Sequence, residues 1–258
     1  MARTKIEWSN LVWNPVTGCT IISEGCLNCY ARRFAQRLRG RFGYPKDNPF
    51  SVTIHTNRLR QPYRWQKGVV FVCSMGDLFH EDVPSWFIRQ VLDVAADKRN
   101  RNKIFCFLTK RPERMANEIN KWAIERMAVP PNWWCGISAE NQQRLEERLP
   151  WLRVVLASNC FVSLEPLLGP VSIKRAFNKL IPPFKNPSTL VQVVITGAET
   201  GIRRRPCDTN WVRRIRDDCK ELGIRFFLKQ IYVEGKKTSV LDGVDYSRIP
   251  PQEIFGDA

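Results

Sequence analysis

Histidine is scarce in this sequence, which has two, His55 and His80, among 258 residues. Structural zinc ions are commonly held by cysteine and histidine together, so this scarcity counts against such a site. No apolar run reaches the length of a membrane span, and residues 1–10 lack the apolar core of a signal peptide. We therefore expect a cytoplasmic protein without a membrane partner, in which stable disulfides do not form.

Acidic residues are also few: 25 Asp and Glu stand against 41 Lys and Arg, a net charge of +16. A positive field favours polyanions, and nucleic acid is the commonest one in the cytosol. A general solubility effect is the alternative.

Arginine is densest at residues 58–67 and 202–216, where it is interleaved with tyrosine and tryptophan. This mixture suits phosphate contact combined with base stacking, although a solvated helix face would look similar. The predicted nucleic-acid contacts are Arg58, Arg60, Arg64, Arg203, Arg204 and Arg205.

Short apolar runs alternate with segments of helical spacing, and the apolar fraction of 43% is that of a globular chain. Near-continuous apolar runs are typical of parallel strands whose sheet is covered by helices. The runs are residues 12–16, 52–56, 69–73, 103–108, 133–137, 160–162, 191–196 and 224–228. They predict an α/β fold, a complete or nearly complete TIM-like (β/α) barrel, with an open doubly wound sheet as the alternative. Residues 1–232 would form the barrel, and the polar, turn-rich residues 233–258 a C-terminal surface tail.

Polar residues follow almost every predicted strand. In (β/α) barrels the active site lies at the carboxyl ends of the strands, so these residues are candidates for it. Some of them would instead be helix caps, a role that Ser, Asp and Glu also favour. The residues concerned are Ser74, Asp77, Thr109, Lys110, Ser138, Glu140, Ser163, Glu165 and Glu199.

Three of the nine cysteines, Cys19, Cys26 and Cys29, cluster with the spacing C-x6-C-x2-C directly after the first predicted strand. Thiolates select zinc or iron–sulfur centres. A structural zinc ion would need a fourth ligand, whereas a 4Fe–4S cluster on three cysteines leaves one iron open. That iron can bind S-adenosylmethionine, and an electron from the cluster then yields a 5′-deoxyadenosyl radical. Structural zinc and unrelated cysteines remain alternatives.

The end of this motif, Cys26-Leu27-Asn28-Cys29-Tyr30, resembles the CxxC-aromatic end of radical S-adenosylmethionine enzymes, although their usual first gap is x3. More closely, the chain resembles a family of phage and prophage proteins with this three-cysteine motif. The matching stretches are residues 4–8, 13–19, 26–31, 71–84, 108–115, 136–140, 163–170, 197–201 and 226–230.

This resemblance implies a barrel of the radical-SAM type in a phage-infected bacterial host. Cys19, Cys26 and Cys29 would hold the cluster, and Glu165 and Lys110 would act with them in catalysis. The residues implied to contact the cofactor are Tyr30, Thr56, Asn57, Ser74, Asp77, Thr109, Lys110, Ser138, Glu140, Ser163 and Glu165. Tyr30 could equally be a core aromatic, and His55-Thr56-Asn57 stands where the superfamily carries Gly-Gly-Glu.

The function expected from these features is radical modification or rearrangement of a base in phage DNA, of the hypermodified thymidine type. The enzyme would be a base-modifying isomerase or mutase that receives electrons from a donor such as flavodoxin or ferredoxin. Because a paired base cannot enter a barrel, it would be extruded first. One alternative is a zinc- or cluster-containing nucleic-acid binding protein without radical chemistry. Another, a metal-dependent hydrolase using Asp77, Glu140, Glu165 and Glu199, leaves the cysteines unexplained.

Overall fold

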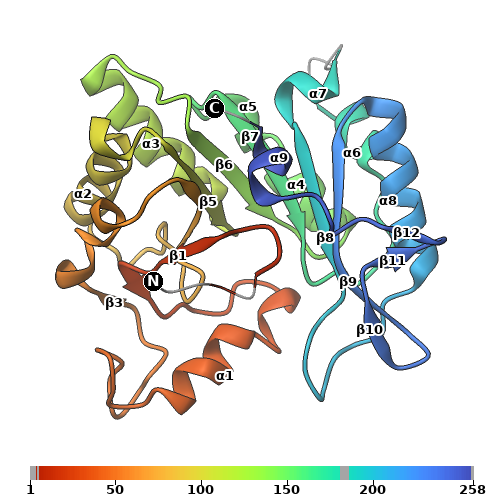
Figure 1. Cartoon of the computed structure of the whole chain (residues 1–258), viewed down its shortest axis with the longest axis horizontal. Helices are drawn as coiled ribbons and strands as arrows, with labels where there is room; N and C mark the ends of the chain where they lie inside the picture. The colour runs from red at the N-terminus through yellow and green to blue at the C-terminus, as the bar shows by residue number, and fades with distance from the viewer. Residues whose placement is uncertain (1–3, 5, 181–185, 257–258) are drawn as a thin grey trace.

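The computed structural model describes residue 4 and residues 6–180 and 186–256. Its centre is an eight-stranded sheet in which seven strands run parallel (Figure 1). Those seven are β1 (Leu11–Trp13), β4 (Gly68–Val72), β5 (Lys103–Thr109), β6 (Trp133–Ser138), β7 (Asn159–Leu164), β8 (Val193–Gly197) and β9 (Arg225–Val233). The eighth, β10 (Lys236–Thr238), pairs antiparallel with β9. The prediction of a parallel α/β fold is confirmed.

The strands lie in the order in which they occur along the chain, β1-β4-β5-β6-β7-β8-β9-β10. This is the order of a (β/α) barrel, because a doubly wound sheet reverses its order at a switch point. Within the described residues no hydrogen-bonded pairing joins β1 to β9 or β10. Closure of the sheet into the expected complete or nearly complete barrel is therefore not confirmed.

The run at residues 52–56 does not join the large sheet, which corrects the prediction of a barrel strand there. Only β3 (Thr53–Ile54) forms, and it pairs antiparallel with β2 (Val16–Thr17). Both β3 residues are half-buried, whereas β4 is buried throughout. The run alternates polar and apolar residues, which is typical of a partly solvated strand rather than a central parallel one.

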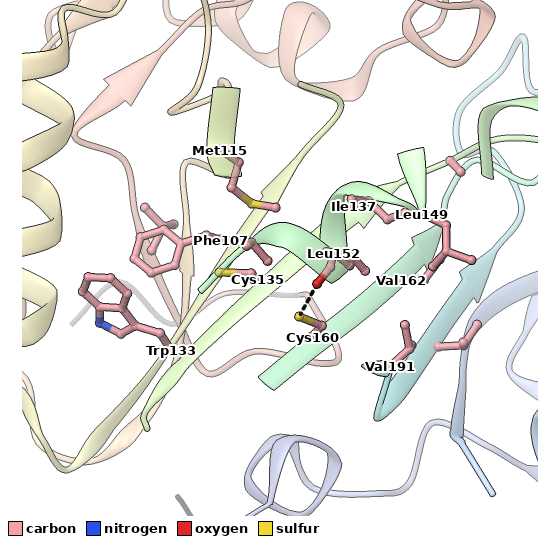
Figure 2. Packing of buried hydrophobic residues seen from close by; sticks show 14 of the residues in the cluster. Phe107, Met115, Trp133, Cys135, Ile137, Leu149, Leu152, Cys160, Val162 and Val191 are labelled. Atoms are coloured by element: carbon pink, nitrogen blue, oxygen red, sulfur yellow. Dashed lines mark hydrogen bonds between the residues drawn. The ribbon is translucent and has the colours of Figure 1, made fainter. Parts of the chain in front are cut away.

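Helices cover the outer face of the sheet. They are α2 (Ser85–Ala96), α3 (Pro112–Arg126), α4 (Gln142–Arg148), α5 (Trp151–Val154), α6 (Ile173–Asn178), α7 (Pro187–Leu190) and α8 (Thr209–Leu222). Figure 2 shows Met115 of α3 and Leu152 of α5 packed with Phe107, Cys135 and Val162 from three neighbouring strands. This layer is the main hydrophobic core. No described helix is both long and apolar enough to cross a membrane.

The inner face of the sheet has a second, smaller core near the amino ends of the strands. The ring centroids of Trp8 and Phe71 lie 4.6 Å apart with the rings tilted, and those of Phe255 and Trp134 lie 5.0 Å apart. Phe255 belongs to α9 (Pro251–Phe255), which lies across this face in Figure 1. Within the surface tail expected at 233–258, Ile254 and Phe255 do not lie at the surface: each is 2% exposed, because they cover apolar side chains that the outer helices cannot reach.

The remaining elements are short and lie in connections. Helix α1 (Tyr30–Arg37) follows the three-cysteine segment. Strands β11 (Val240–Leu241) and β12 (Val244–Asp245) form a small hairpin. Four 3-10 turns complete the fold: η1 (Glu24–Cys26), η2 (Thr56–Arg58), η3 (Gln61–Arg64) and η4 (Lys98–Asn100).

Candidate active site

A cavity of about 660 Å³ opens at the carboxyl ends of the parallel strands. Its walls come from the segments after β1, β4, β5, β6, β7 and β8, from β9, and from α1. The volume lies in the range of cofactor and substrate sites. Apolar side chains fill the amino end of the same inner face, so the sheet offers a closed end and an open end.

The three clustered cysteines all line this cavity. Cys26 lies in η1, Cys29 immediately precedes α1, and Cys19 precedes both in the loop after β2. Each is a half-buried free thiol. In the described residues, no group of three or more His, Cys, Asp or Glu side chains is arranged to hold a metal ion. The donor types and the open space beside them fit a thiolate-ligated cluster.

The Cys19 sulfur has a charged neighbour, Arg111. Arg111 Nη1 donates to Cys19 Sγ at 3.4 Å, and its Nη2 donates to Thr20 Oγ1 at 2.9 Å. Asp77 accepts from the same guanidinium at 3.3 Å and from Thr109 Oγ1 at 2.8 Å. Burial, followed by the Asp77 charge, raises the pKa of Cys19 to about 11 although Arg111 opposes the shift. Metal binding there would release a proton.

A row of polar groups crosses the cavity opposite the cysteines. Lys110 Nζ donates to Ser138 Oγ at 2.6 Å, and Ser138 Oγ donates to the Glu165 carbonyl oxygen at 3.2 Å. The Glu165 carboxylate pairs with Lys229 Nζ at 2.9 Å and accepts from Ser163 Oγ at 3.3 Å. All five line the cavity, so four predicted residues converge as expected. Sequence reasoning missed Lys229, although a lysine directly after the last apolar run was a usable signal.

Tyr30 and Ser74 close the side of the cavity next to the cysteines. The Tyr30 hydroxyl donates to the Ser74 carbonyl oxygen, and Ser74 Oγ donates to Asn14 Oδ1 at 3.2 Å. Burial raises the pKa of Tyr30, so the phenol is neutral at physiological pH. Asn14, at the exit of β1, also lines the cavity and was not predicted.

Glu140 does not face the cavity, which corrects its assignment as a cofactor contact. It is fully buried and its Oε2 accepts from Arg148 Nη1 at 3.0 Å. A Cβ placed on Gly25 would lie 3.0 Å from the Glu140 carboxyl carbon. Glu140 therefore lies directly behind residues 19–29, the cysteine segment. The Glu140 carboxylate is therefore paired with Arg148 and packed against Gly25 rather than directed into the cavity.

Glu199 and Arg205 also hold the cysteine segment in place. Asn28 donates to Glu199 Oε2 at 2.8 Å and to the Arg203 carbonyl oxygen at 3.0 Å. Arg205 binds Glu199 through its Nε at 3.1 Å and donates to the Glu24 carbonyl oxygen at 3.0 Å. Burial alone would raise the pKa of the Glu199 carboxyl, but bonds from Arg205 and Asn28 hold it below its ordinary value.

The other predicted contacts lie elsewhere. Thr56 and Asn57 are exposed in η2 and do not line the cavity, because the strand expected to carry them there is absent from the sheet. Arg58 donates to backbone oxygens of Asn14, at 3.0 Å, and Phe42. Arg60 and Arg64 line a separate depression of about 570 Å³.

Three solved structures share the fold, all of spore photoproduct lyase. The first, complexed with a dinucleoside spore photoproduct, has a TM-score of 0.50 at 11% identity over 85% of this chain. The chain spans 63% of that structure. Two single-substitution variants each give a TM-score of 0.57, at 9% and 10% identity, covering 89% and 88% of this chain and 78% of the lyase.

No curated protein matches the chain. A family sequence profile does match it, over residues 3–250. The chain belongs to that family, which is described as a protein of unknown function (DUF5131).

Proposed function

We propose that this protein is a radical S-adenosylmethionine enzyme that modifies a base of nucleic acid, with a 4Fe–4S cluster held by Cys19, Cys26 and Cys29. One observation carries the proposal: the three clustered cysteines, and no other partly exposed thiol, line the cavity at the carboxyl ends of the strands. The fourth partly exposed cysteine, Cys207, is outside it. The fold shared with spore photoproduct lyase, solved in complex with a dinucleoside spore photoproduct, supports the proposal.

When bound, such a cluster supplies the electron that cleaves S-adenosylmethionine. The chain's own side chains would orient that cofactor. Lys110 and Lys229 present ammonium groups suited to its carboxylate, and the Glu165 carboxylate suits its amino or ribose hydroxyl groups. Ser138 and Ser163 fix the direction of these charged groups through the bonds described above. The apolar end of the inner face closes the bottom of the site against water.

The substrate class rests on charge and on the shared fold. The net charge of +16 favours a polyanion. The matched lyase binds a dinucleoside photoproduct. A base in phage DNA, of the hypermodified thymidine type, is the specific substrate we propose, with flavodoxin or ferredoxin as electron donor.

The test begins with anaerobic purification and measurement of iron, sulfide and zinc per chain. We expect a brown protein that absorbs at about 400 nm, as thiolate-ligated iron–sulfur centres do. With S-adenosylmethionine and dithionite it should release 5′-deoxyadenosine. Incubation with phage DNA followed by nucleoside analysis should then reveal an altered thymidine derivative.

The outcomes separate the candidates. A colourless protein holding one zinc ion per chain would favour a nucleic-acid binding protein without radical chemistry. A brown protein that forms 5′-deoxyadenosine but leaves every DNA nucleoside unchanged would keep the radical chemistry and reject the DNA substrate.

A further inference from the structure

The loop between β8 and α8 carries an isoleucine with almost no protein contact. Ile202 is 99% exposed, and the loop extends beyond the carboxyl end of the sheet (Figure 1). A single exposed apolar residue is ordinary on a protein surface. This one is of interest because its loop lies beside the candidate active site.

A second exposed aliphatic side chain lies on the neighbouring cysteine segment, between Cys26 and Asn28, which both line the cavity. Leu27, on the cysteine segment, is 61% exposed. The residues that follow these two, Asn28 and Arg203, are joined by a 3.0 Å hydrogen bond from Asn28 Nδ2 to the Arg203 carbonyl oxygen. The two loops are therefore tied together, and each presents an aliphatic side chain to solvent.

The same loop also carries free positive charge. Arg203 and Arg204 are exposed, and the Arg203 guanidinium has no hydrogen bond or ion pair among the described residues. Arg204 lies over the Tyr232 ring with its guanidinium carbon 4.0 Å from the centroid. Arg33, which lines the cavity, donates to the Thr200 carbonyl oxygen at 2.9 Å and so holds the start of the loop.

We infer that Ile202, assisted by Leu27, is a wedge that enters a base-paired nucleic acid and helps to extrude one nucleotide into the cavity. This inference rests on the proposed function and specifies its substrate as duplex. Aliphatic side chains act in this way where flanking arginines hold the phosphates, because the wedge replaces part of the lost stacking. Extrusion of a paired base costs a few kcal/mol, which such a contact offsets.

The test compares Ile202→Ser with Ile124→Ser, which removes the same side chain from an exposed position, 67% accessible, on outer helix α3. The probe is a short DNA duplex containing 2-aminopurine, whose fluorescence rises when the base is unstacked, together with the same strand alone. Wild type and Ile124→Ser should raise the fluorescence of the duplex. Ile202→Ser should bind the single strand like wild type but the duplex about tenfold more weakly, without the fluorescence rise.

Equal duplex affinity and equal fluorescence for Ile202→Ser and wild type would overturn the wedge, even if the enzyme retains its cluster. A wild-type protein that binds only the single strand would also overturn it, while leaving radical chemistry on nucleic acid intact. Failure to bind either probe would instead reject the proposed nucleic-acid substrate, and the wedge with it. None of these readouts depends on cluster assembly, so the wedge can fail while the proposed radical chemistry stands, and the outcomes distinguish the two failures.

Discussion

The two ends of the inner face of the sheet are built from the same strands and serve opposite purposes. At the amino end, Trp8, Phe161 and Phe255 pack into an aromatic cluster. At the carboxyl end, Lys110, Glu165 and their neighbours surround a cavity. Every second residue of a strand points to the same face. On the inner face, a shift of only a few residues along one strand therefore separates a position that stabilises the fold from one that contacts a ligand.

The largest expected effect lies at the carboxyl end. Cys29→Ala should abolish cluster binding and 5′-deoxyadenosine formation while leaving the melting temperature of the metal-free chain nearly unchanged, because a half-buried thiol contributes little packing. Iron content and differential scanning calorimetry measure the two quantities. Cys207→Ser is the matched control, since Cys207 is also half-buried but lies outside the cavity. If Cys29→Ala kept the colour and the cleavage reaction, the assignment of the cluster to these cysteines would be wrong.

The amino end should respond in the opposite sense. Phe255→Ala leaves a cavity beside Trp8, Trp134 and Phe161, all in ring contact with Phe255, and should cost about 3–5 kcal/mol of unfolding free energy. Urea unfolding of the metal-free chain measures it. At a temperature where the variant is folded, its iron content should match that of wild type. A variant as stable as wild type would show that α9 does not contribute to the core.

This contrast also explains which features could be predicted from the sequence. Apolar runs identified seven strands of the sheet because buried parallel strands are apolar throughout, and the polar residues after them placed Lys110, Ser138, Ser163 and Glu165 at one end. The burial of Phe255 was missed because its five-residue helix is surrounded by polar sequence, and only the distant strands show what it covers.

Glu140 was misassigned for a related reason. An acidic residue after a strand looks the same in sequence whether it faces the cavity or turns behind a loop. Here the orientation of Glu140 is decided by Arg148, the last residue of α4, and by Gly25, whose missing side chain leaves room for the carboxyl group. Both are tertiary contacts without a local signal.

A smaller effect is expected at the carboxyl end, where the positive charge of Arg111 lies next to Cys19, a proposed cluster ligand. Arg111 donates to Cys19 Sγ, and its positive charge should stabilise the more negative, reduced form of a cluster bound there. Arg111→Gln should lower the equilibrium constant for reduction about tenfold, which is a fall of about 59 mV in midpoint potential for one electron. Redox titration followed by electron paramagnetic resonance measures this shift.

The control for Arg111→Gln is Arg126→Gln, which removes the same charge from the far end of α3, where it pairs with Asp93. If Arg111→Gln loses the cluster, Arg111→Lys provides the measurement, with a smaller fall expected because the charge is kept and the planar donor is lost. Unchanged potentials in the variant that retains iron would remove Arg111 from the tuning of the site.

The smallest effect should distinguish the strands that support the cysteine segment, β2 and β3, from the central strands by their response to acid. His55 lies beside the start of the cysteine segment, where its Nε2 shares a 2.8 Å hydrogen bond with Thr17 Oγ1. Burial, followed by the charge of Arg58, lowers the pKa of His55 to about 4. In the unfolded chain the ordinary value is about 6.5, so between these values the unfolded form binds more protons and stability falls as the pH falls. Protection of the β2 and β3 amides, corrected for intrinsic exchange, should weaken by about 1 kcal/mol from pH 7 to pH 5.5. The amides of β5 and β6 should change less, and His55→Gln should remove the difference. An equal loss in both pairs of strands, unaffected by that substitution, would mean that acid acts on the whole sheet rather than on the support of the cysteine segment.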